Sequence, residues 1–145
     1  MIQRIQSLLL LLTAIGFGSL FGIPLITTDK SIPKLLDDKT YNILDHPVLI
    51  VLTLAGALVS FATIFLFKKR EKQLRLSYII SILTVVLPLI AFLLIYNEGI
   101  TLVPESIIQY EPGLYILIIN LVLSFLSSYY IKKDQKLVNS MDRLR

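Results

Sequence analysis

Long apolar runs without charged residues alternate with short polar segments along the whole chain. Each run approaches the ~20 residues that a helix needs to cross ~30 Å of hydrocarbon. A charge at mid-span would cost roughly 2.5–3.5 kcal/mol on insertion scales, and none of these runs contains one. Because lipid offers the backbone no hydrogen-bond partner, we expect the runs to be helices. The predicted spans are Ile5–Ile26, Val48–Phe67, Leu76–Tyr96 and Leu114–Ile131.

This pattern predicts an all-α membrane protein with four transmembrane helices in an antiparallel bundle, forming a single domain over residues 1–145. The composition agrees, since 55% of the 145 residues are hydrophobic and the mean hydropathy is +0.77. A soluble chain of this length could not hide so much apolar surface in a core. A cleaved signal peptide is the alternative for the first run, but that run is too long and no A-x-A-like site follows it.

The polar segments predict the orientation of the spans. Eleven basic residues fall on one side: Arg4, five between Lys68 and Arg75, and five after residue 131. The other side has three, all in the first of its two loops. The excess of Lys and Arg marks the cytoplasmic side, so we expect both termini in the cytoplasm.

The charged residues suggest no chemistry of their own. The net charge is +4, but the charges lie between apolar blocks, which indicates membrane orientation rather than nucleic-acid binding. There is no Cys, which excludes thiol catalysis and thiolate metal sites, and there is one His. Asp45 and His46 follow Asp37 and Asp38, but the spacing fits no loop for a hard metal. We predict no catalytic, cofactor or metal residues.

Small residues in the first two runs are candidates for close helix packing. In membranes such residues let a neighbouring backbone approach. Two interpretations stay open: packing of the first run against the second within one chain, which we favour, or a seam between two copies. The candidates are Ala14, Gly18 and Gly22 in the first run and Gly56 and Ser60 in the second.

Two residues interrupt the later runs. Pro88 removes one backbone hydrogen bond from the third run, which can expose carbonyl groups to a substrate but more often only shapes the helix. Asn120 is the most polar side chain deep in any run, and Ser124 follows one turn later on the same face. We expect this face to meet another helix rather than lipid.

The segment after residue 131 is predicted to continue the fourth helix beyond the bilayer. Leu137, Met141 and Leu144 recur at i, i+4 and i+7 and form one apolar stripe. The stripe, with Arg143 and Arg145, could lie on anionic lipid or dock on a cytoplasmic partner. In the second outer loop, Pro104 indicates the start of a short helix.

The two ends of the chain carry a resemblance. The start, residues 1–6, the basic connection at 68–75 and the finish, residues 134–145, are similar to a four-helix integral membrane protein family of the Bacteroidota, domain of unknown function 4293. The length and the four-span plan are alike over the whole chain. The resemblance implies an inner-membrane protein of a Gram-negative bacterium and implies no activity.

Three classes of function are compared. The small-residue stripes and the patterned tail favour a non-catalytic subunit or scaffold of a membrane complex, with lipid and other membrane proteins, or a second copy, as partners. The alternative is a small oligomeric transporter or channel, although proton-coupled exporters of this size need a carboxylate inside the membrane and these runs have none. A membrane enzyme would need acid–base or metal-binding residues, and the sequence offers little material for them.

Overall fold

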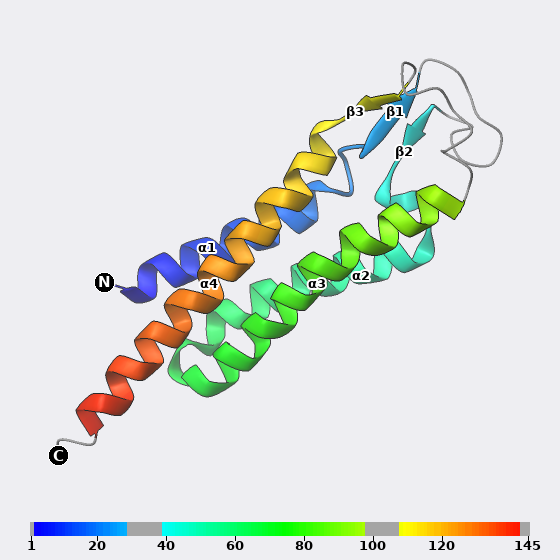
Figure 1. Ribbon diagram of the computed structural model, residues 1–145. Coiled ribbons are helices and arrows are strands. Elements are labelled where there is room, and N and C mark those ends of the chain that lie inside the picture. Colours follow the sequence, from blue (N-terminus) through cyan, green and yellow to red (C-terminus); the bar gives the residue numbers. More distant parts are fainter. Residues whose placement is uncertain (1, 29–38, 98–107, 143–145) are drawn as a thin grey trace.

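The computed structural model describes residues 2–28, 39–97 and 108–142. Four helices account for most of these residues: α1 (Ile2–Ser19), α2 (Pro47–Phe65), α3 (Arg70–Asn97) and α4 (Pro112–Asp142). α1 and α3 each pack against both α2 and α4, and the long axes run side by side (Figure 1). The predicted helical class is therefore confirmed for the part of the chain that the structure describes.

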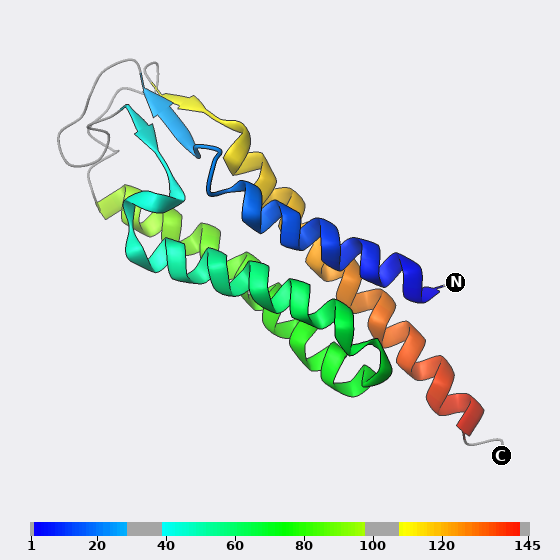
Figure 2. The same ribbon diagram turned by 180° about the vertical axis from the view of Figure 1, so that it is seen from behind.

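A small sheet lies at one end of the four helices (Figure 1). It contains β1 (Ile26–Thr28), β2 (Thr40–Tyr41) and β3 (Ile108–Tyr110), in the order β2-β1-β3 with antiparallel pairing. We call this end of the molecule the sheet end. The opposite end, where α2 meets α3 and α4 runs on toward the C-terminus, is called the basic end (Figure 2).

The first helix is shorter than the sequence predicted. α1 ends at Ser19, a turn follows, and Ile26 already belongs to β1. Gly22 and Pro24 explain the early end, because glycine weakens a helix and proline restricts the residue before it to extended conformations. The prediction of a helix from Ile5 to Ile26 is wrong for its last seven residues, and Gly22 cannot take part in helix packing.

The other helices begin at recognisable signals. Pro47 and Pro112 are the first residues of α2 and α4, where a missing N–H has no consequence. His46 caps α2, its Nδ1 accepting a hydrogen bond from the backbone N–H of Val48 at 3.3 Å. α3 starts within the basic connection, after a short 3-10 turn (Leu66–Lys68), and α4 continues through the predicted tail to Asp142.

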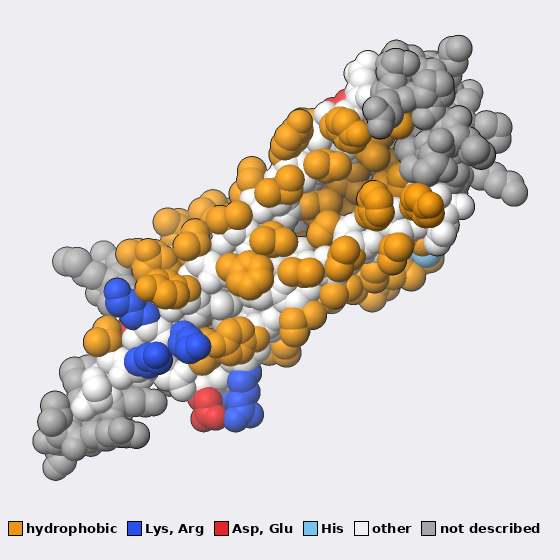
Figure 3. All heavy atoms as spheres, viewed as in Figure 1, with side chains coloured by type: hydrophobic (Ala, Val, Ile, Leu, Met, Phe, Trp, Pro, Cys, Tyr) orange, Lys and Arg blue, Asp and Glu red, His pale blue; other side chains and the backbone are white. Residues whose placement is uncertain are grey.

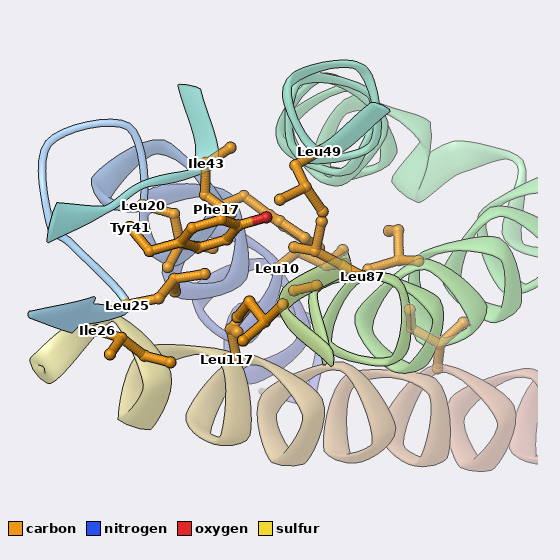
Figure 4. Packing of buried hydrophobic residues seen from close by; sticks show 14 residues of the cluster. Leu10, Phe17, Leu20, Leu25, Ile26, Tyr41, Ile43, Leu49, Leu87 and Leu117 are labelled. Carbon is orange, nitrogen blue, oxygen red and sulfur yellow. The ribbon is translucent and has the colours of Figure 1, made fainter. Parts of the chain in front are cut away.

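The apolar core is concentrated near the sheet end. Figure 4 shows Tyr41 and Leu25 from the sheet region gathered with Leu20, the residue after α1, close to Phe17. Leu49 of α2 and Leu87 of α3 belong to the same buried cluster. Much of the outward surface is also apolar, as Figure 3 shows for one face. An apolar outer surface is what a helix bundle in lipid needs, and a soluble one avoids.

Candidate functional site

The contact between α3 and α4 is polar toward the basic end. The side chains of Ser81 and Ser128 lie 3.1 Å apart, oxygen to oxygen, and those of Thr84 and Ser124 lie 2.9 Å apart. Ser128 also lies within hydrogen-bonding distance, 3.2 Å, of the backbone carbonyl of Ser77. All five residues are buried. We call them the hydroxyl seam; it joins two helices directly through side-chain hydrogen bonds.

Longer side chains extend this polar contact at the basic end. The Gln6 amide of α1 donates to the carbonyl of Tyr130 at 3.0 Å. Gln73 in α3 donates to a carbonyl of α2 at 3.4 Å. An ion pair joins Arg70, the first residue of α3, to Asp134 of α4 at 3.2 Å, with both side chains largely shielded. All four helices are thus tied together at this end by polar side chains.

Other buried polar side chains have no hydrogen-bond partner among the described protein atoms. They are Thr53, Ser60, Asn120 and Ser127. Asn120 of α4 lies against Gly16 of α1, where an added Cβ would collide with the amide group. The structure therefore places Asn120 at a contact between helices. Its amide fits beside α1 because position 16 has no side chain.

The small residues selected from the sequence divide into two groups. Gly56 and Ser60 are buried on α2, and a Cβ at Gly56 would lie 2.6 Å from the ring of Phe17. Gly18 is exposed, with no atom near its missing Cβ, and Ala14 is half-buried. Within one chain, the expectation that the stripe Ala14, Gly18 and Gly22 packs closely is wrong for both glycines.

The glycine of α1 that does make a close contact, Gly16, was not selected from the sequence. Thr13 and Phe17 are separated by one turn of α1 and are both buried in the structure. These two residues mark the packed face, and Gly16 adjoins it. The spacing of the glycines alone favours Gly18, which is exposed.

Toward the sheet end the contact between α3 and α4 opens into an apolar pocket of about 370 Å³. Its walls are the stretch 88–95 of α3, the stretch 114–121 of α4, and residues of β1, β3 and the link before β1. Figure 3 shows the face on which α3 and α4 lie, with hydrophobic side chains around this recess. Pro88, noted from the sequence as a helix interruption, lines the pocket while α3 continues through it. A second, wider groove of about 550 Å³ lies between α1 and α2.

The structure describes only part of the predicted tail. The part of α4 beyond Ile131 is helical to Asp142, and the Leu137 side chain is 46% exposed. Lys132, Lys133 and Lys136 are exposed on the same stretch. Met141 lies within the helix, and its side chain is not described; Arg143, Leu144 and Arg145 lie outside the described residues, as does the helix expected near Pro104.

Two residues considered as cation ligands have structural roles. The Asp45 carboxylate accepts a hydrogen bond from the backbone N–H of Asn42 at 2.6 Å. His46 caps α2, as described above. Asp37 and Asp38 lie outside the described residues. The geometry at Asp45 and His46 thus serves the start of α2.

The fold and its surface define a membrane protein, because three of the described helices are long and apolar enough to cross a bilayer. The apolar part of α1, Ile5–Ser19, is shorter. The chain belongs to the family described as "Domain of unknown function (DUF4293)", whose model matches residues 2–144. Comparison with curated proteins and with solved structures finds no match.

Proposed function

We propose that this protein is a non-catalytic subunit of a bacterial inner-membrane complex, and that the extension of α4 docks a partner in the cytoplasm. Four spans with both termini inside the cell are part of this proposal. α1 is its shortest span, with 18 residues that measure about 27 Å at 1.5 Å per residue. Its packing against α2 and α4 supports a position beside them in the bilayer.

The distribution of charge supports the orientation. Lys and Arg side chains gather at the basic end, next to the C-terminal part of α4 (Figure 3). The segment that begins α3 and the segment 132–136 of α4 both lie there, joined by the Arg70–Asp134 ion pair. Positive charge favours the cytoplasmic side of a membrane protein, so the basic end is proposed to face the cytoplasm.

The length of α4 is the observation that carries the proposed function. Its 31 residues measure about 46 Å at 1.5 Å per residue, whereas the hydrocarbon core is about 30 Å thick. The helix continues past the ends of its neighbours at the basic end (Figures 1 and 2). Along the projecting part, Leu137 is exposed beside several lysines, which gives a partner both an apolar contact and charge.

A pull-down in mild detergent tests the proposal. The tagged full chain is compared with a variant that lacks residues 140–145 and with Leu137→Asp, each at matched abundance in the membrane. We expect the full chain to capture a stoichiometric protein that both variants lose. The matched control is Leu126→Asn, which changes an exposed leucine of α4 outside the extension; this variant should keep the partner.

Two results would overturn this function. If the full-length chain and the two variants of the extension capture the same proteins, the extension of α4 binds lipid and docks no partner. A homo-oligomer without any other protein would instead support the small transporter or channel.

A further inference from the structure

We propose that the apolar pocket between α3 and α4 is a binding site for one hydrocarbon chain of a membrane phospholipid. The proposal rests on the membrane insertion given under the proposed function, but not on the docking role of α4. The pocket measures about 370 Å³, within the range of ligand sites. Apart from the phenol of Tyr110, every side chain that lines it is hydrocarbon.

Backbone contacts hold the start of α4 at the level of the pocket. The backbone N–H of Gly113, at the start of α4, donates to the carbonyl of Pro24 at 3.2 Å, and the backbone N–H of Glu111 donates to the carbonyl of Leu25 at 3.1 Å. A Cβ at Gly113 would lie 2.9 Å from the carbonyl carbon of Pro24, so the two backbones are in direct contact. The start of α4 is thus fixed to the segment between α1 and β1, and Leu25 of that segment lines the pocket.

The side chains that α3 presents to α4 change from polar to apolar where the pocket begins. The hydroxyl seam ends at Thr84, and one turn later Pro88 lines the pocket. Pro88 has no N–H, so the helical hydrogen bond to the Thr84 carbonyl is missing. The Thr84–Ser124 link between α3 and α4 therefore lies next to the missing hydrogen bond of α3, and the pocket opens beyond it.

The pocket suits hydrocarbon better than water. A stable internal water needs two to four polar partners, and an apolar cavity stays dry. A hydrocarbon chain gains dispersion contacts with the walls. Phe92 and Ile118, which both line the pocket, are 65% and 56% exposed, so its mouth lies on the apolar outer surface of the bundle. In a bilayer that surface is surrounded by acyl chains.

The position of Tyr110 favours a lipid with a headgroup over a free hydrocarbon. Tyr110 ends β3 at the sheet end, lines the pocket, and is 62% exposed. Tyrosine is enriched at the level of lipid headgroups, where its ring is apolar and its hydroxyl is hydrated. A phospholipid can therefore place one chain in the pocket and its headgroup beside Tyr110, without moving either group out of its usual depth.

Two neighbouring residues of α4 provide a matched test. Ile118 lines the pocket, and Ile119 is equally exposed, at 54%, but does not line it. The full-length protein is purified in detergent, palmitoyl-oleoyl phosphatidylethanolamine is added, and native mass spectrometry measures the fraction that carries one lipid. We expect Ile119→Trp to bind lipid like the unmodified protein. Ile118→Trp fills the pocket and should lower the bound fraction at least fivefold. If that variant does not fold, Leu114→Trp narrows the same pocket from the sheet end.

Equal lipid binding by the two tryptophan variants would overturn the proposal. So would a dimer that Ile118→Trp alone dissociates, because a second copy would then occupy the pocket. Resistance of the protein to extraction from membranes at alkaline pH measures insertion separately. Failure of lipid binding is thereby distinguished from failure of the membrane assignment.

Discussion

The contact between α3 and α4 is polar in one half and apolar in the other. Toward the basic end, hydroxyl pairs and the Arg70–Asp134 ion pair join the helices directly. Toward the sheet end, apolar side chains line a pocket between them. In water the apolar half would be expected to close, since burial of apolar area is the main driving force there. Here the polar half is the closed one.

The difference follows from the solvent. Lipid chains are as apolar as leucine, so hydrophobic burial gives no net drive for helix association in a bilayer. Interhelical hydrogen bonds and close packing provide that drive instead. A purely apolar contact between membrane helices can therefore stay open to lipid at little cost, whereas hydroxyl groups that meet across two helices gain a hydrogen bond that lipid does not offer. The predictions below test this difference, beginning with the largest effect.

The anchor of α4 at the sheet end should be the most sensitive point. Gly113→Val places a side chain against the backbone of Pro24, which cannot move as a side-chain tip can. We expect a loss of about 1–3 kcal/mol in stability, the usual range for overpacking, measured by thermal unfolding in detergent. Gly18→Val is the control, because nothing lies within 4 Å of the missing Cβ at Gly18. Equal losses for both variants would contradict the contact at Pro24.

The ion pair at the basic end should have the next largest effect. Arg70→Gln leaves Asp134 shielded and without its partner, and we expect a loss of about 1–2 kcal/mol, less than for a fully buried pair because water still reaches part of Arg70. Arg75→Gln breaks the exposed pair with Glu71 and should cost about 0.3–0.5 kcal/mol. Chemical unfolding of the two variants compares the pairs. A larger loss at Arg75 than at Arg70 would show that the shielded pair is not formed.

The hydroxyl seam should give a smaller effect than the shielded ion pair. A double-mutant cycle with Thr84→Val and Ser124→Ala isolates their mutual hydrogen bond, for which we expect a coupling of about 0.6 kcal/mol. Thr53 has no hydrogen-bond partner among the described protein atoms, so Thr53→Val should leave stability unchanged or raise it. A coupling near zero would contradict the hydrogen bond between Thr84 and Ser124, and a clear loss from Thr53→Val would contradict the absence of a partner for Thr53.

The sequence predicts the helical part of the fold well because lipid imposes simple requirements. An uncharged run of sufficient length has to be a helix, and the helices found cover most of each predicted run. The small sheet was missed, because β1 is only three residues long and pairs with segments far away in the chain. Gly22 and Pro24 mark the early end of the first helix, but no local pattern near Ile26 indicates that the following residues form a strand.

The candidate site was predicted less well for a related reason. Asn120, Ser124 and Pro88 attracted attention as exceptions within apolar runs, and each lies at the α3–α4 contact or beside α1. The pocket itself is formed by ordinary residues such as Leu117 and Ile118, which differ from their neighbours only in position. A sequence does not distinguish apolar residues that face lipid from apolar residues that face a pocket.

Cysteine pairs test most directly whether the two halves of the α3–α4 contact differ in the membrane. The chain has no native Cys, so each pair is the only source of a disulfide. Ser81→Cys with Ser128→Cys replaces oxygens 3.1 Å apart at the hydroxyl seam, and Phe92→Cys with Ile118→Cys joins the two helices at the pocket. In isolated membranes with a mild oxidant, we predict rapid disulfide formation in the first pair and little in the second, because bridged Cα atoms must lie within about 7 Å. Equally rapid formation in both pairs would show that the pocket is closed in the bilayer and would contradict the account.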